Sequence, residues 1–243
     1  MKQALIGSAI ALCMVGPAFA VDCSAFPNFT INTFINDDVT ATGISCTIGP
    51  KGTVNGNVTQ TGVGNLVIRG VVNGAVSESG SGNVTIAGGR VGGDLSEADA
   101  GSVVVRGGGS VNGLLEEAGD GSVTVTVDVP GVVNGDIFES GPGSVTVNAF
   151  SGSFEGSVIE TGVGNVVVDV DPGVSFKGSI EEYDGGNVTA AVDGLFEGNI
   201  AEFDLGNVST TGTGTFKGNS EHELPGTCAN SIIDFQGAVC NLL

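Results

Sequence analysis

The chain has 243 residues, of which 27 are acidic and only 7 are basic, and its formal net charge is −20 at pH 7. Such a charge disfavours binding to nucleic acid or to anionic lipid, and it favours cations and basic partners. Glycine is abundant, at 43 residues, but lacks the three-residue period of collagen. The many valines argue against disorder, so we expect a folded acidic protein.

Residues 1–20 predict a secretory signal peptide. Lys2 supplies a positive charge, an apolar core follows over residues 5–15, and Ala18, Phe19 and Ala20 form a small-residue cleavage site. This core is too short to span a bilayer, and no later segment is long and apolar enough to do so. We expect a bacterial protein that is secreted or held at the cell surface, with the periplasm as an alternative.

A repeat of about 20 residues occupies the chain from Thr53 to about Gly218. Its first glycine recurs at spacings of 18 to 22 residues, at Gly56, Gly74, Gly93, Gly113, Gly135, Gly156, Gly178, Gly198 and Gly218. Apolar residues lie two positions before and two positions after this glycine, and a Gly-x-Gly segment follows in most repeats. A period of this length predicts a solenoid, and the alternation within each unit predicts strands rather than helices.

The fold class that we predict is all-β: a single parallel β-solenoid, or β-helix, of about nine coils of ~20 residues. The glycine segment is the expected corner, where the backbone adopts positive φ or passes close to the next coil. Asp99, Asp184 and Asp204 replace its first glycine and tolerate positive φ better than most residues. We place a signal peptide at 1–20, an N-terminal cap at 21–51, solenoid repeats at 52–218 and a C-terminal cap at 219–243.

One core position changes along the chain. Two residues before the anchor glycine, valine occupies the first five repeats and phenylalanine the last four, from Phe154 to Phe216. Stacked phenylalanine rings need more width than valine. We therefore expect the solenoid to broaden toward its C-terminal end.

Four cysteines follow the predicted signal peptide, namely Cys23, Cys46, Cys228 and Cys240. Export permits disulfides, and four cysteines allow three pairings. The first two cysteines precede the repeats and the last two follow them, so a rod of about 40 Å separates the two pairs. A disulfide needs Cα atoms within about 7 Å, which predicts Cys23–Cys46 and Cys228–Cys240, one staple in each cap.

A glutamate four residues after the anchor glycine is the sharpest candidate site. It recurs in seven consecutive repeats, as Glu78, Glu97, Glu117, Glu139, Glu160, Glu182 and Glu202. Like charges one strand apart repel, so the arrangement needs a compensation. We expect these side chains to splay into solvent at the corner. The alternatives are cations between the coils, plausibly calcium, and carboxyl groups kept protonated by raised pKa values.

An enzyme is a less favoured class. Polysaccharide-acting β-helix enzymes carry their sites on long loops, whereas these repeats vary by only a few residues. There is no Trp, and Tyr183 and His222 are the only residues of their kinds; we interpret His222 as part of the C-terminal cap. Ice binding is also weak, because the threonine row beside the second strand is interrupted by valine.

The corner resembles the repeat of bacterial curlins, which carry Gln-x-Gly-x-Gly-Asn in each unit. Residues 60–65 match this motif in full, and residues 78–83 and 160–165 match it except that Glu replaces Gln. The period and alternation are equally similar to haemagglutinin-type β-helix repeats of secreted adhesins. Either resemblance implies a surface or matrix role, although an ionised Glu ladder lacks the amide hydrogen bonds of a stacked Gln ladder.

The function that we expect is a secreted structural or adhesive surface protein, such as a curlin-like fibre or biofilm-matrix subunit that self-associates. The alternative is a monomeric acidic module that binds cations such as calcium, or an extracellular protein or carbohydrate. We expect no catalytic residues and no bound nucleic acid.

Overall fold

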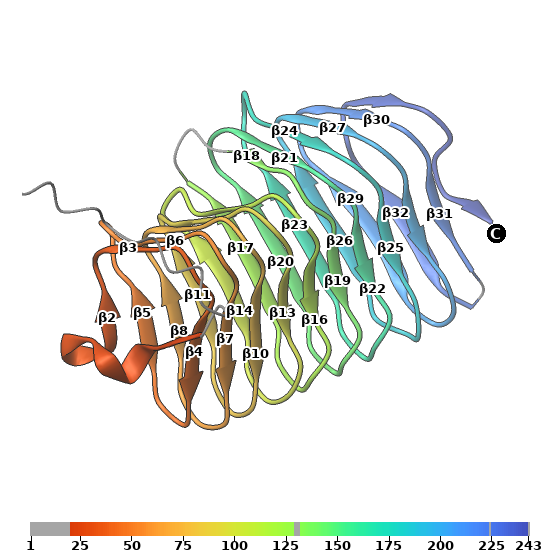
Figure 1. Cartoon of the computed structure of the whole chain (residues 1–243). Helices are drawn as coiled ribbons and strands as arrows, with labels where there is room; N and C mark the ends of the chain where they lie inside the picture. Colours follow the sequence, from red (N-terminus) through yellow and green to blue (C-terminus); the bar gives the residue numbers. More distant parts are fainter. Residues whose placement is uncertain (1–19, 129–131, 224, 243) are drawn as a thin grey trace, which may run out of the picture.

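The computed structural model describes residues 20–128, 132–223 and 225–242. It is a parallel β-solenoid, as predicted, in which successive coils stack along one axis from the N-terminal to the C-terminal end (Figure 1). The predicted signal peptide lies outside the described residues except for Ala20. The described residues contain no helix that is long and apolar enough to cross a membrane.

Two long sheets run the length of the solenoid. Sheet A has 12 strands: β1 (Val21–Asp22), β4 (Val39–Thr42), β7 (Val58–Thr61), β10 (Val76–Ser79), β13 (Leu95–Glu97), β16 (Leu115–Glu117), β19 (Ile137–Glu139), β22 (Val158–Glu160), β25 (Ile180–Glu182), β28 (Ile200–Glu202), β31 (Ser220–His222) and β34 (Asn241–Leu242). Sheet B has 11 strands: β2 (Thr30–Ile31), β5 (Cys46–Ile48), β8 (Leu66–Ile68), β11 (Val84–Ala87), β14 (Val103–Arg106), β17 (Val123–Val127), β20 (Val145–Ala149), β23 (Val166–Val170), β26 (Val188–Val192), β29 (Asn207–Thr211) and β32 (Thr227–Asn230).

The third side of each coil carries two shorter sheets. Sheet C contains β3 (Phe34–Ile35), β6 (Thr53–Val54), β9 (Val71–Val72), β12 (Arg90–Val91) and β15 (Ser110–Val111). Sheet D contains β18 (Val132–Val133), β21 (Ser153–Glu155), β24 (Ser175–Lys177), β27 (Leu195–Glu197), β30 (Thr215–Lys217) and β33 (Asp234–Gln236). Two 3-10 helices, η1 (Cys23–Ala25) and η2 (Pro27–Phe29), lie in the first coil.

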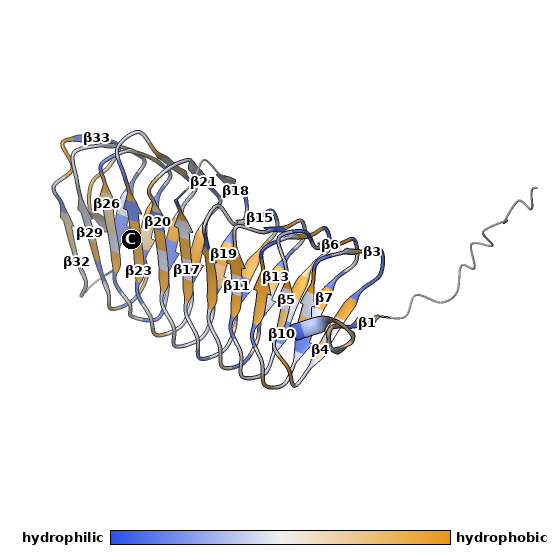
Figure 2. Ribbon diagram, turned by 90° about the vertical axis from the view of Figure 1, so that its left-hand side faces the viewer, coloured by the Kyte–Doolittle hydropathy of each residue, from blue (hydrophilic) through white to orange (hydrophobic). Residues whose placement is uncertain are grey.

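The predicted inward face is confirmed. Every coil contributes alternate residues of its strands to one continuous core, as β17 does with Val123, Val125 and Val127. Figure 2 shows these apolar segments running along the strands, with polar residues at the corners. Because parallel strands pair residue with residue, each core position stacks on the same position of the next coil. One coil cannot bury its own apolar face, so stability comes from this stacking.

The third side changes along the rod, as the switch from valine to phenylalanine predicted. Strands of sheet C are two residues long, whereas those of sheet D after β18 are three residues long. Phe154, Phe176, Phe196 and Phe216 stack with ring centroids 4.7–4.8 Å apart, and Phe235 continues the stack at 4.5 Å. The coils are wider at the C-terminal end in both views (Figures 1 and 2).

The segments predicted as caps also form coils. Strands β1 to β5 and β32 to β34 pair within the same sheets as the repeats, so sheet B has 11 strands where the repeat predicted about nine coils. The predicted disulfides are confirmed. Cys23 pairs with Cys46 and Cys228 with Cys240, with Cα atoms 6.0 and 5.4 Å apart.

Candidate functional site: a buried carboxyl ladder

The seven repeated glutamates form one row on sheet A, which we call the carboxyl ladder: Glu78, Glu97, Glu117, Glu139, Glu160, Glu182 and Glu202. Each is the register partner of the next, so the ladder is about 29 Å long at the ~4.8 Å spacing of strands. None of the seven side chains is more than 1% exposed. The expectation that they splay into solvent is therefore wrong.

The reason lies in the alternation of the strand. In β10, Val76 faces the core and Ser77 faces outward, so Glu78 must return to the inward side. The same inward, outward, inward order holds for the last three residues of β16. The alternation in the sequence therefore predicts a buried glutamate, whereas the free-energy cost of burying a carboxylate predicts an exposed one.

In six of the seven rungs, the corner after the strand provides backbone donors for one carboxyl oxygen. Oε1 of Glu117 accepts hydrogen bonds from the amides of Gly119, at 2.9 Å, and Gly121, at 3.2 Å. Glu139 repeats this with the amides of Gly141 and Gly143, at 2.9 and 3.3 Å. Glu97, Glu160, Glu182 and Glu202 each accept one such bond at 2.6–3.2 Å.

Close approach of neighbouring coils explains the glycines of this corner. A Cβ atom on Gly121 would collide with the carbonyl oxygen of Gly101 in the preceding coil. Positive φ is required at fewer places than expected: Asp184 and Asp204 have φ of 78° and 97°, but Asp99 is not among the residues with positive φ. The corner is therefore tight mainly between coils, which brings the amides toward the ladder.

The second carboxyl oxygen has no such partner. Oε2 is buried and without a hydrogen-bond donor in all seven residues, and Glu78 also lacks a partner for Oε1. The only salt bridge among the described residues joins Lys217 to Glu197, outside the ladder. An unpartnered buried carboxylate is strongly disfavoured, so ionisation of the whole row is not a plausible resting state.

Neighbouring rungs interact directly. Glu78 is in register with Glu97, and the same register relates every later pair of rungs, so carboxyl groups of adjacent coils are neighbours along the whole row. Two ionised carboxylates are both acceptors, so a hydrogen bond between them requires a proton. A proton between two rungs would give their unpartnered Oε2 atoms a donor.

Burial raises the pKa of six ladder residues and is the largest cause of the shift in each of them. The pKa is about 8 for Glu97, about 9 for Glu160 and about 7 for Glu182. The pKa values of Glu78, Glu139 and Glu202 are raised as well. The backbone amides at the corner oppose this effect, since they favour the ionised form.

The two ends of the ladder carry different residues. Gln60 precedes Glu78 in register and is fully buried; its Nε2 donates to the carbonyl oxygens of Thr61 and Gly62, at 3.3 Å each. His222 follows Glu202 in register and is partly buried, with an unpartnered Nδ1. His222 lies in β31, a strand of sheet A, rather than outside the coils.

The donor set fits calcium poorly. Calcium takes six to eight oxygen ligands. In most rungs one carboxyl oxygen already accepts backbone N–H bonds, which leaves a single free oxygen per coil. Within the part of the chain that the structure describes, no group of three or more His, Cys, Asp or Glu side chains is arranged to hold a metal ion.

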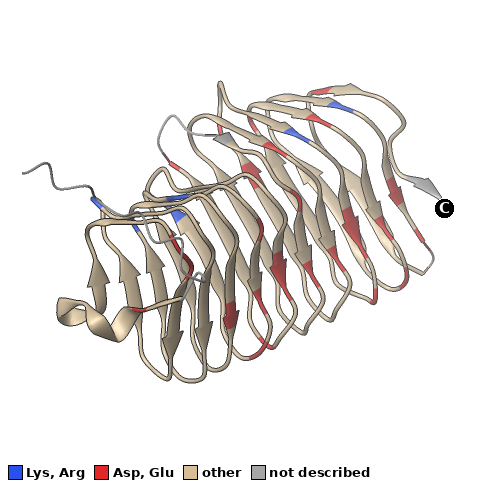
Figure 3. Ribbon diagram, in the orientation of Figure 1, with Lys and Arg blue, Asp and Glu red and all other residues tan. Residues whose placement is uncertain are grey.

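A second charged row lies on the outside of sheet D. Glu155, Lys177, Glu197 and Lys217 are register neighbours, so the sign of the charge alternates from coil to coil. Lys217 Nζ lies 3.0 Å from Glu197 Oε1, and this ammonium lowers the pKa of Glu197. Figure 3 shows these alternating colours beside the uniformly acidic row on sheet A.

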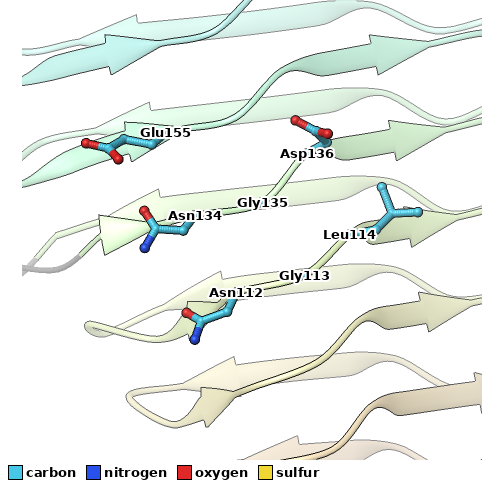
Figure 4. Close-up of a pocket in the computed structure, with 7 residues that line it drawn as sticks. All are labelled: Asn112, Gly113, Leu114, Asn134, Gly135, Asp136 and Glu155. Carbon is cyan, nitrogen blue, oxygen red and sulfur yellow. The ribbon is translucent and has the colours of Figure 1, made fainter.

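A shallow crevice lies where sheet C gives way to sheet D (Figure 4). Its polar side chains are Asn112, Asn134, Asp136 and Glu155, which extend from the outer surface of successive coils. Asp136 already accepts a hydrogen bond from the amide of Ser157, at 2.8 Å. The crevice is open, and it brings together only two carboxylates.

The interrupted threonine row lies on the outward side of sheet B. Thr85, Thr124, Thr146 and Thr189 stand there in register with Val67, Val104 and Val167. Directly after strands β25 and β28 of sheet A, the Tyr183 ring stacks on Phe203, with centroids 4.5 Å apart, and the Tyr183 hydroxyl donates to Glu181. The outer surfaces at sheets A and B thus carry different side chains, and these residues form no enclosed site.

Comparisons with protein-family models, with curated proteins and with solved structures give no match. The resemblance to curlin and haemagglutinin-type repeats therefore remains a prediction from the repeat motif alone.

Proposed function

We propose that the chain is a secreted structural or adhesive rod of the bacterial surface, as a fibre or biofilm-matrix subunit. The observation that carries this proposal is the uninterrupted coil. From β2 onward, no connection between successive strands is longer than five residues, as in 98–102. Enzymes and ligand-binding proteins commonly place their sites on longer loops, whereas repeated flat faces and strand edges suit assembly and adhesion.

The C-terminal end of the rod supports self-association. Strands β32 and β33 are the last strands of their sheets, so one edge of each has no partner strand among the described residues. Ile233, between these two strands, is 79% exposed, and the Phe235 ring ends the aromatic stack. An unpaired strand edge beside exposed apolar side chains favours the addition of another strand.

Light scattering of the purified chain, with both disulfides formed, tests this proposal over several days. We expect slow growth toward long particles. Ile233→Lys should retard that growth, because it places a charge at the last coil. Val163→Lys is the matched control, since Val163 is similarly exposed, at 72%, but lies on a lateral corner. A chain that stays monomeric contradicts assembly into fibres and favours the acidic binding module.

A further inference from the structure

The ladder holds seven buried carboxyl groups whose Oε2 atoms have no partner in the folded chain. We propose that the carboxyl ladder is a proton-binding site. It takes up protons from solvent when the chain folds, and neighbouring rungs share them. Each shared proton lets one Oε2 donate to the carboxyl group of the adjacent coil. The ladder then becomes a line of hydrogen bonds along the rod axis.

The Gln60 rung shows that this buried position accepts a neutral side chain. Gln60 is a neutral side chain of the same shape as a protonated Glu, and it occupies the same register position under full burial. Its Oε1 is buried and has no donor, and both oxygens of the adjacent Glu78 are likewise without a partner. A proton on Glu78 gives Gln60 Oε1 its donor, which satisfies both rungs at once.

The surroundings of the ladder contain almost no positive charge. The charged groups that act on the ladder from the corners are Asp99 near Glu78, Asp184 near Glu182, and Asp204 and Glu223 near Glu202. His222 is the single group of the opposite sign, and it acts on Glu202 only. Neutralisation by a neighbouring base is therefore confined to the last rung, and protons must supply it elsewhere.

The proposal rests on this geometry, and the direction of the pKa shifts agrees with it. Neutral carboxyl groups keep the Oε1 bonds to the corner amides and add a bond between coils, whereas ionised ones repel along the whole row. The rod is then expected to be most stable in acidic surroundings and to loosen at the ladder in alkaline surroundings. This behaviour does not depend on whether the chain forms fibres.

Infrared spectroscopy of the folded chain tests the proposal, because a protonated carboxylic acid has a carbonyl stretching band that a carboxylate lacks. We expect this band at neutral pH and its loss under alkaline titration. The double variant Glu139→Gln with Glu160→Gln, which changes two adjacent rungs, should weaken the band. The matched control, Glu116→Gln with Glu155→Gln, removes two outward carboxylates and should leave the band unchanged.

Three outcomes overturn the proposal. The first is a wild-type chain without the acid band at neutral pH, which is decisive even where a variant fails to fold. The second is equal weakening of the band in the ladder variant and the control. The third is disappearance of the band on addition of calcium chloride together with a higher melting temperature, which assigns the ladder to cations instead.

Discussion

Two rows of charged side chains run along the same rod and obey opposite rules. On the outer surface of sheet D, Glu155, Lys177, Glu197 and Lys217 alternate in sign from coil to coil. Inside sheet A, seven glutamates repeat without one opposite charge between them. In the outer row, a lysine is the register neighbour of each glutamate. We infer from the uniform inner row that burial has converted its side chains from carboxylates to carboxylic acids.

The largest loss of stability is expected when a carboxyl group is buried at a position that lacks the backbone donors of the Gly-x-Gly corner. Val76→Asp places it two residues before Glu78 on the same inward face, but with no Gly-x-Gly amides at hand. We expect loss of at least about 4 kcal/mol and unfolding of the neighbouring coils. Thermal melting followed by circular dichroism measures this. A variant with the melting temperature of the wild type would show that a buried carboxyl group does not need the backbone donors of the corner.

The next effect is the pH dependence of stability. Folded pKa values of about 7 to about 9 exceed the ordinary value of 4.5 for Glu182, Glu97 and Glu160. Groups of this kind stabilise the fold fully below the unfolded pKa, and their contribution is lost as pH rises through the folded pKa. We expect the free energy of unfolding to fall by several kcal/mol between about pH 5 and about pH 9.

Denaturant titrations at a series of pH values measure this fall. Glu139→Gln with Glu160→Gln should flatten the profile, because both carboxyl groups have raised pKa values and amides do not titrate. The control, Glu116→Gln with Glu155→Gln, makes the same change in net charge on the outside and should keep the slope. A slope that the two variants reduce equally would trace the effect to the overall charge rather than to the ladder.

Gly121→Ala probes the corner itself. The added Cβ collides with the carbonyl oxygen of Gly101, so neighbouring coils must separate and the amide of Gly121 must move away from Glu117. We expect a loss of about 1–3 kcal/mol, as for other overpacked sites. The melting temperature reports it. Gly173→Ala is the comparison for a glycine with open space around its Cβ, although its φ of 82° adds local strain.

Gln60→Glu converts the one amide rung into a carboxyl rung. An ionised Glu at this position cannot donate to the carbonyl oxygens of Thr61 and Gly62, as Gln60 does. We expect a loss of about 1 kcal/mol at neutral pH, a recovery in acid and a steeper pH profile. Denaturant titration at both pH values checks this. A variant as stable as the wild type in alkaline solution speaks against the proton requirement of the row.

The smallest effect belongs to the outer row. Lys177→Glu creates three like charges in succession with Glu155 and Glu197, all of them accessible to solvent. Surface charges are well hydrated and screened, so we expect a small drop in melting temperature that disappears at high salt. Melting at two salt concentrations measures it. A large, salt-independent drop would mean that outer and inner rows follow the same rule.

Much of this architecture could be predicted from the sequence because repetition magnifies weak signals. The nine anchor glycines and the alternation around them were enough for the solenoid, the inward face and the disulfide pairing. The extra coils were not predicted, since residues 21–51 and 219–242 lack the repeat, although they pair with the sheets and add side chains such as Ile31, Ile48 and Ile232 to the core. The burial of the ladder was missed for a physical reason. The alternation predicted that Glu78 is buried. The free-energy cost of burying one ionised carboxylate, considered without its neighbours, predicted that it is exposed.

The most direct test of the account is a count of protons. Potentiometric titration of the folded chain, less that of the chain unfolded in guanidinium with its disulfides intact, gives the protons that folding binds at each pH. We predict that the folded chain binds several more protons than the unfolded chain near neutral pH, and that Glu→Gln changes in the ladder reduce this number. Equal proton binding by the folded and unfolded chains at neutral pH would contradict the account.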